Sequence, residues 1–123
     1  AGKTIASFER HLAPGIAVIR AMPNTPAQVG RGVTACVANA ATTAGQKAIA
    51  SALLAAAGSV VWLDREGDMD AVTAVSGSGP AYVFLVAECL AEAGRAAGLS
   101  PELADELARA TVSGAGEILS RSG

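Results

Sequence analysis

The pattern of apolar and polar positions changes character about halfway along the chain. Up to Leu63, short β-branched runs alternate with Ala-rich segments of helical spacing, whereas after Asp64 almost every stretch favours helix. Strands are expected at residues 17–22, 33–38 and 59–63. The apolar character of the first suits a strand covered on both faces, as in parallel sheets. This rhythm is typical of the closing portion of a doubly wound α/β sheet.

Helix signals surround these strands. Apolar residues at helical spacing predict a short surface helix over residues 4–12. Thr42 or Thr43 can cap a helix that runs to about Ala57, where Gly58 supplies the stop. The upstream part is therefore expected to alternate helix and strand.

Two longer helices are expected downstream. The first runs from Pro80 to Ala97, is apolar on nearly all sides and is ended by Gly98. The second begins after the N-cap Ser100 and continues to about residue 120, with a row of small side chains that would let another helix approach closely. Such helices must be buried, and a partner chain is the natural cover.

Composition narrows the classes of function. The net charge of −2 and the absence of a basic patch argue against a nucleic-acid partner. Cys36 and Cys89 lie far apart and outside any CxxC pair, so we interpret both as reduced core residues of a cytoplasmic protein. The longest apolar run, residues 81–87, is too short to cross a bilayer, so no membrane contact is expected.

The most distinctive stretch is the turn Ser76-Gly77-Ser78-Gly79-Pro80. Its small residues permit close backbone approach, and Pro80 suits the first position of a helix. A dinucleotide fingerprint would need a third Gly where Tyr82 stands, so direct pyrophosphate binding is not favoured.

The sequence gives little support for a serine nucleophile or for a metal site. His11, the single histidine, is interpreted as a solvated surface residue, which leaves a serine nucleophile without a general base. The alternating acidic residues 64–70 fail as a calcium loop, because Val75 stands where a bidentate Glu is required. No metal site is predicted.

Two segments resemble the signatures of pyrroline-5-carboxylate reductase: RAMPNTPAQVGRGVTA at residues 20–35 and MDAVTAVSGSGPAYVF at residues 69–84. The resemblance covers only the middle of a family member. It implies an α/β part followed by an all-α part, the C-terminal portion of a Rossmann-like dinucleotide-binding domain (1–66) joined to an incomplete helical dimerisation and substrate domain (67–123).

The resemblance also implies an activity: NAD(P)H-dependent reduction of 1-pyrroline-5-carboxylate to L-proline, in a homodimer or an oligomer of dimers. It identifies no catalytic acid. The residues carried over as substrate-binding are Glu66, Ser76 and Ser78, and those carried over as cofactor-binding are Ala1, Gly2, Met22, Pro23, Asn24 and Thr25.

Several alternatives stay open. Asn24 could instead close an Asx-type turn, and Ser76 and Ser78 could cap the following helix. The Gly-rich phosphate loop and the later Ser-Pro-Gly-Gly loop of the family are absent from this sequence, so the chain alone is expected to be inactive. A non-catalytic dimerisation module and a related imine or carbonyl reductase are the rival functions.

Overall fold

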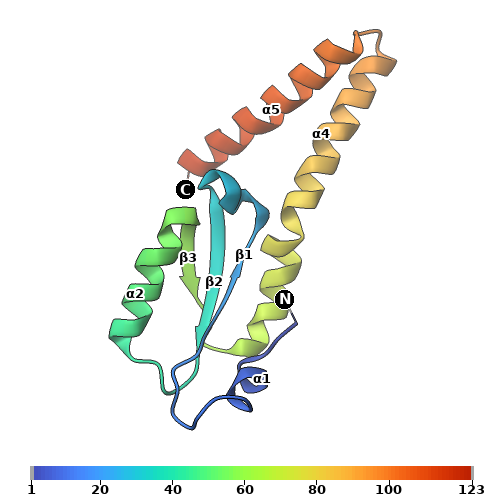
Figure 1. Cartoon of the computed structure of the whole chain (residues 1–123). Helices are drawn as coiled ribbons and strands as arrows, with labels where there is room; N and C mark the ends of the chain where they lie inside the picture. Colours follow the sequence, from blue (N-terminus) through green and yellow to red (C-terminus); the bar gives the residue numbers. More distant parts are fainter. Residues whose placement is uncertain (1, 123) are drawn as a thin grey trace. The chain divides into compact units, whose positions relative to one another are not determined.

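The computed structural model describes residues 2–122, which divide into two compact units between Ser78 and Gly79 (Figure 1). This division lies further along the chain than the domain boundary expected after residue 66. The reason is that Met69 is completely buried in the core of the first unit. The loop after the last strand therefore packs with the sheet.

The first unit contains a three-stranded sheet in the order β1 (Ile19–Pro23), β2 (Gly32–Ala38), β3 (Gly58–Trp62). Strands β2 and β3 are parallel, as expected, but β1 is antiparallel to β2 and partly exposed, so the expectation of a covered parallel strand is wrong. Only residues 24–31 join β1 to β2, and so short a link cannot make the crossover that parallel strands require.

One face of the sheet carries the core. In the register of β1 and β2, Arg20 is paired with Val37 and Met22 with Ala35, so these side chains share a face. The buried cluster on that face is Ile5, Ala35, Val37 and Met69, with Val18, Met22, Leu63 and Val72 packed against it. The helical segment after β3 thus lies on the same face as Arg20 and Met22.

Helix α2 (Ala44–Leu54) covers the opposite face, where the indole Nε1 of Trp62 donates to Ser51 Oγ at 3.0 Å. As predicted, Thr43 caps this helix, and its side chain and that of Gln46 form a reciprocal capping box. The 3₁₀ turn η2 (Ala55–Ala57) then leads to Gly58, which begins β3.

Helix α1 (Ile5–Glu9) is shorter than predicted and not purely a surface helix, because Ile5 is buried in the core cluster. His11 follows it and is exposed, in agreement with the sequence. The connection between β1 and β2 contains the 3₁₀ turn η1 (Thr25–Val29), which ends at Gly30 with φ +69°. After β3 the chain forms η3 (Glu66–Asp68), α3 (Met69–Val72) and a single π-helical turn, η4 (Thr73–Gly77).

The second unit is a hairpin of α4 (Gly79–Ala96) and α5 (Pro101–Arg121). Gly98 turns the chain with φ +99°, and Ser100 caps α5 by accepting from the N–H of Leu103. Ala104 and Ala108 are buried. Within the row of small residues, Ala104 and Ala108 therefore face α4 of the same chain, whereas Thr111 and Ala115 are exposed. Approach of a partner helix along this row stays a prediction.

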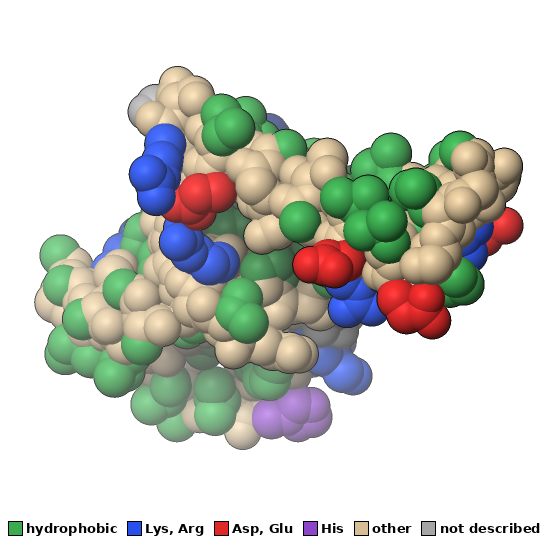
Figure 2. Space-filling model, turned by 90° about the horizontal axis from the view of Figure 1, so that it is seen from above, with side chains coloured by type: hydrophobic (Ala, Val, Ile, Leu, Met, Phe, Trp, Pro, Cys, Tyr) green, Lys and Arg blue, Asp and Glu red, His purple; other side chains and the backbone are tan. Residues whose placement is uncertain are grey.

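Much of the hairpin surface is apolar. Five consecutive side chains, residues 82–86, are each about half exposed or more. Cys89 is also exposed in this chain, so only Cys36 fits the prediction of a buried thiol, and both thiols are free. In the space-filling view, hydrophobic side chains lie at the surface between scattered acidic and basic groups (Figure 2).

By length and composition alone, the helical run Glu66–Ala96 could cross a bilayer. Core helices of soluble proteins pass the same test, so this is weak evidence. The absence of membrane contact stays a prediction.

Candidate functional site

The two signature segments meet in the first unit. Strand β1 ends at Pro23, and the chain turns through Asn24 into η1, whose start is fixed by Pro26. Across from this turn lies η4, where the helix widens to a π turn. Single π turns inside helices are frequent at functional sites. The predicted residues Met22 and Asn24 therefore face the second signature.

Asn24 makes the main polar link between these segments. Its Oδ1 accepts from the backbone N–H of Val33 at 2.9 Å, and its Nδ2 donates to the backbone carbonyl of Ser76 at 3.2 Å. The alternative reading as an Asx turn does not describe this geometry, because Asn24 makes no local side-chain cap. The carboxamide instead joins the end of β1 to the start of β2 and to η4.

Thr73 and Met22 form a second contact between the segments. The Thr73 Oγ1 lies 3.1 Å from Met22 Sδ and 2.8 Å from the carbonyl oxygen of Met69. A hydroxyl has a single proton, and the carbonyl is the stronger acceptor. The proton therefore goes to the Met69 carbonyl, and Met22 reaches η4 through contact of its sulfur with the Thr73 oxygen.

Glu66 is held by one of its two carboxylate oxygens. Oε1 accepts from Arg20 Nη1 and from the backbone N–H of Ile5, each at 2.8 Å. Partial burial alone would raise the pKa of Glu66, but the hydrogen bonds from Ile5 and Arg20 and the Arg20 charge together lower it. Glu66 is therefore an anion at neutral pH, and Oε2 has no protein donor among the described residues.

The two serines differ in their surroundings. Ser76 Oγ donates to the carbonyl of Val72 at 3.1 Å, so it does not cap the following helix. Ser78 is exposed, and among residues 2–122 its hydroxyl has no hydrogen-bond partner. Ser78 is thus the more accessible hydroxyl of the second signature.

The remaining predicted residues are more loosely placed. Gly2 has φ +78° and open space around it, and Pro23 and Thr25 are exposed. Ala1 lies outside the described residues. The structure brings Met22 and Asn24 close to the segment that contains Ser76. Glu66 follows β3 and pairs with Arg20, which lies on the same face of the sheet as Met22. Roles in binding substrate or cofactor stay predictions for all of these residues.

Two residues of this site were missed from the sequence: Arg20 and Thr73. A signal for Arg20 was available, because it lies two positions before Met22 on a strand and so points to the same face. In the structure its side chain is only 13% exposed, and Glu66 is the carboxylate partner that such burial of an arginine requires. Thr73 gave no such signal, since its contact depends on the register of β1 against the helix.

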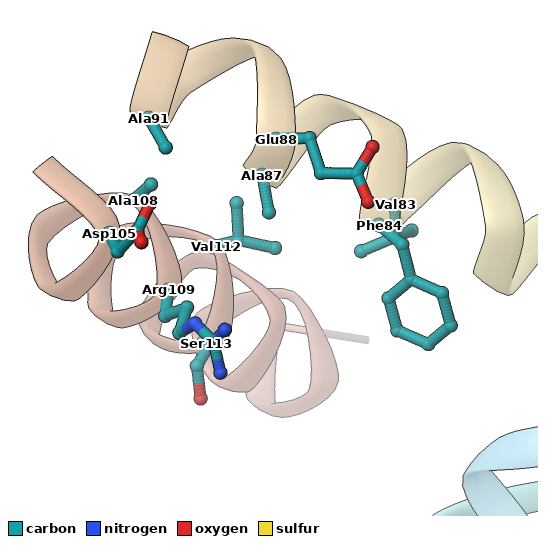
Figure 3. A pocket seen from close by; sticks show the side chains of 10 residues that line it. All are labelled: Val83, Phe84, Ala87, Glu88, Ala91, Asp105, Ala108, Arg109, Val112 and Ser113. Atoms are coloured by element: carbon teal, nitrogen blue, oxygen red, sulfur yellow. The ribbon is translucent and has the colours of Figure 1, made fainter. Parts of the chain in front are cut away.

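The second unit has a groove of its own. A cavity of about 470 Å³ lies between α4 and α5, and most of its lining side chains are apolar or small (Figure 3). Ionisable groups also line it: Glu88 on α4, and Asp105 and Arg109 on α5. Its lining contains neither histidine nor cysteine.

Comparison with known proteins gives a consistent result. Residues 66–123 match the family model described as pyrroline-5-carboxylate reductase dimerisation. The chain is 47% identical over 118 residues to pyrroline-5-carboxylate reductase of Pseudomonas aeruginosa, covering 96% of this chain and 43% of that protein. It is 50% identical over 119 residues to the enzyme of that name from Mycobacterium tuberculosis, covering 97% of this chain and 40% of that protein. The chain thus spans well under half the length of these relatives.

Solved structures agree. A pyrroline-5-carboxylate reductase from Coxiella burnetii superposes with a TM-score of 0.91 at 39% identity, covering 97% of this chain and 44% of that chain. The Plasmodium falciparum pyrroline carboxylate reductase with NADP bound superposes with a TM-score of 0.83 at 35% identity, covering 96% of this chain and 47% of that chain. These likenesses confirm the expected fold class, the end of a Rossmann-like sheet followed by a helical dimerisation domain. Over nearly its whole length, the chain belongs to the pyrroline-5-carboxylate reductase family.

Proposed function

We propose that this chain forms part of an enzyme that reduces 1-pyrroline-5-carboxylate to L-proline with NAD(P)H. The observation that carries the proposal is that the two signature segments, about 50 residues apart in sequence, form one hydrogen-bonded unit through Asn24 and Ser76. A turn at a strand end beside a widened helical turn gives two walls of a site. The named relatives support the choice of reaction.

The chain fits only part of the nicotinamide cofactor. Pro23, which is exposed at the end of β1, offers apolar surface to a flat ring, whereas Met22 points to the core face beside Thr73. The described residues include no Gly-rich loop for the phosphates. When bound, the reduced nicotinamide supplies the hydride. We assign Gly2, Met22, Pro23, Asn24 and Thr25 to the region around the ring. The choice between NADPH and NADH depends on contacts that this chain does not include.

The substrate is a cyclic imine with a carboxylate. On reduction, its C=N carbon receives hydride, the π electron pair of the C=N bond moves to nitrogen, and nitrogen keeps or takes up one proton. An ionised Glu66 with a free Oε2 would stabilise the protonated imine, because positive charge on the ring nitrogen attracts a carboxylate. The exposed hydroxyl of Ser78 and the neighbouring Ser76 would orient the ring.

The partner is a second copy of the chain, which gives a homodimer in the cytoplasm. Support comes from the dimerisation model that matches residues 66–123, and from the apolar side chains that α4 and α5 expose. A two-fold arrangement is the commonest way for one chain to cover such a surface.

The test uses the complete enzyme that contains this chain. Purified protein is given the pyrroline substrate and NADPH or NADH, and oxidation of the cofactor is followed together with formation of proline. Proline formed in equal amount to cofactor oxidised is the expected result. A protein that dimerises without turning over would favour the dimerisation module, and turnover restricted to other imines or carbonyl compounds would favour the related reductase.

A further inference from the structure

Pro80 leaves one backbone carbonyl without its helical donor. In a regular α-helix the N–H of residue 80 would donate to the carbonyl of residue 76, but proline has no N–H. The backbone before it adopts the π turn η4, in which the N–H of Ser78 reaches back to the carbonyl of Thr73 at 2.9 Å. The carbonyl of Ser76 must therefore find a donor elsewhere.

Asn24 is that donor. Its Nδ2 lies 3.2 Å from the Ser76 carbonyl oxygen, while its Oδ1 lies 2.9 Å from the N–H of Val33. Only one orientation of the carboxamide satisfies both groups, because Val33 requires an acceptor and Ser76 requires a donor. Asn24 is partly buried, so water competes poorly for these positions.

We infer that Asn24 is a positioning residue: it replaces the hydrogen bond that Pro80 cannot make, and so fixes the Ser76–Ser78 turn against the end of β1. This role differs from direct contact with the cofactor, which the family resemblance suggested for Asn24. Oδ1 and one N–H of Nδ2 are already engaged by backbone groups, and the second N–H of Nδ2 has no acceptor among the described residues.

The kinetic consequence rests on the proposed function. If the Ser76–Ser78 turn contacts the substrate and the Met22–Thr25 turn faces the nicotinamide, Asn24 sets the separation of the two reactants. Small displacements of reacting groups are costly in rate, so loosening this link should slow hydride transfer without weakening attachment of the cofactor. The same link contributes to stability whether or not the enzyme is active.

The substitution Asn24→Asp removes the side-chain donor and keeps the acceptor. Aspartate keeps an oxygen for the N–H of Val33, but it places a second acceptor opposite the carbonyl of Ser76. The matched control is Asn39→Asp. Asn39 also bridges backbone groups, with Oδ1 accepting from Val18 at 3.0 Å and Nδ2 donating to the carbonyl of Ile16 at 2.9 Å, but no proline is involved. It differs from Asn24 in two further side-chain hydrogen bonds, to Glu9 and from Thr42, so only the comparison between the two backgrounds is used.

The first measurement is a double-mutant cycle on the complete protein, read as the midpoint of thermal unfolding. Pro80→Ala supplies an N–H at residue 80, so Asn24→Asp should lower the midpoint less in that background than in the wild type. Asn39→Asp should lower it equally in both. Equal losses for Asn24→Asp in the two backgrounds would overturn the inference.

The second measurement is kinetic. Asn24→Asp should lower kcat with the pyrroline substrate by about tenfold or more, while the Kd for NADPH changes by less than about twofold. Pro80→Ala in the same chain should restore part of the rate. A rise in the Kd for NADPH that matches the loss in rate would show that Asn24 contacts the cofactor. A wild-type enzyme without reductase activity would refute the proposed function, and the stability cycle would still decide the role of Asn24.

Discussion

At the scale of single residues, one carboxylate oxygen of Glu66 joins three segments of the chain. Its Oε1 takes hydrogen bonds from Arg20 on β1 and from the first residue of α1, Ile5. The pKa of Glu66 is lowered in the folded chain, because these hydrogen bonds and the Arg20 charge outweigh the effect of burial. The ion pair therefore stabilises the fold when the pH lies above the ordinary carboxyl pKa, and this contribution is lost as the pH falls through the lowered folded value.

The substitution Glu66→Gln tests this linkage. The amide oxygen can still accept from Ile5, but the charge opposite Arg20 is gone, so thermal stability at neutral pH should fall. The difference from the wild type should shrink as the pH is lowered into the acid range, where the wild-type carboxylate also becomes protonated. Thermal unfolding followed over a pH series gives the answer. A difference that stays constant down to the most acid pH would contradict the assignment.

At the scale of secondary-structure elements, the pairing of β2 with β3 depends on two glycines. Gly32 of β2 is paired directly with Gly58 of β3, and Gly58 has φ +135°. A Cβ on Gly58 would lie 2.0 Å from the carbonyl oxygen of Gly32. We expect Gly58→Ala to lower the free energy of unfolding by about 2 kcal/mol or more, from both steric overlap and an unfavourable backbone angle.

A second glycine provides the control for that substitution. Gly45 lies in the first turn of α2, where an added Cβ meets only Thr43 Oγ1 at 4.0 Å. Gly45→Ala should leave the free energy of unfolding unchanged or raise it by up to about 1 kcal/mol, because alanine favours helix. Denaturant titration compares the two variants. Similar losses for both would mean that β2 and β3 do not approach as closely as described.

Local signals explain which elements could be predicted. Thr43, Gly58 and Ser100 mark element ends through their own side chains or backbone freedom, and the structure confirms all three. The direction of β1 could not be found in this way, because apolar content does not distinguish a parallel strand from an antiparallel one. The π turn was also missed. The presence of Pro80 predicts that one backbone carbonyl lacks its helical donor. The donor that replaces it, Asn24, lies on a distant segment that no local pattern identifies.

For the whole molecule, the missing phosphate loop limits what these 123 residues can bind. The phosphates supply much of the attachment of a dinucleotide, so a polypeptide restricted to this sequence should show no saturable binding of NADPH. Isothermal titration is the measurement, and a circular dichroism spectrum with the expected helix content controls for folding. A micromolar Kd would show that the turn at Met22–Thr25 binds the cofactor without a phosphate cradle.

The hairpin of α4 and α5 carries a second prediction at this scale. Its small residues, Ala91, Ala104 and Ala108, are buried between the two helices, whereas large apolar side chains are exposed. Full burial of a leucine or phenylalanine contributes about 1.5 to 3 kcal/mol, so several of them together favour association strongly. The interface is therefore expected on the exposed large side chains rather than on the alanine row, and Ala108→Arg would disturb the hairpin itself.

A variant on the exposed surface separates association from folding. Leu85 on α4 is 55% exposed in this chain, so Leu85→Glu should fold but should convert the dimer to monomer, because a carboxylate would be buried without a partner at the interface. Glu106→Gln, on the exposed surface of α5, changes charge without adding a buried group and should leave the dimer intact. Light scattering coupled to gel filtration reports the mass of each variant. If Leu85→Glu stays dimeric with unchanged stability, the two copies meet through another surface.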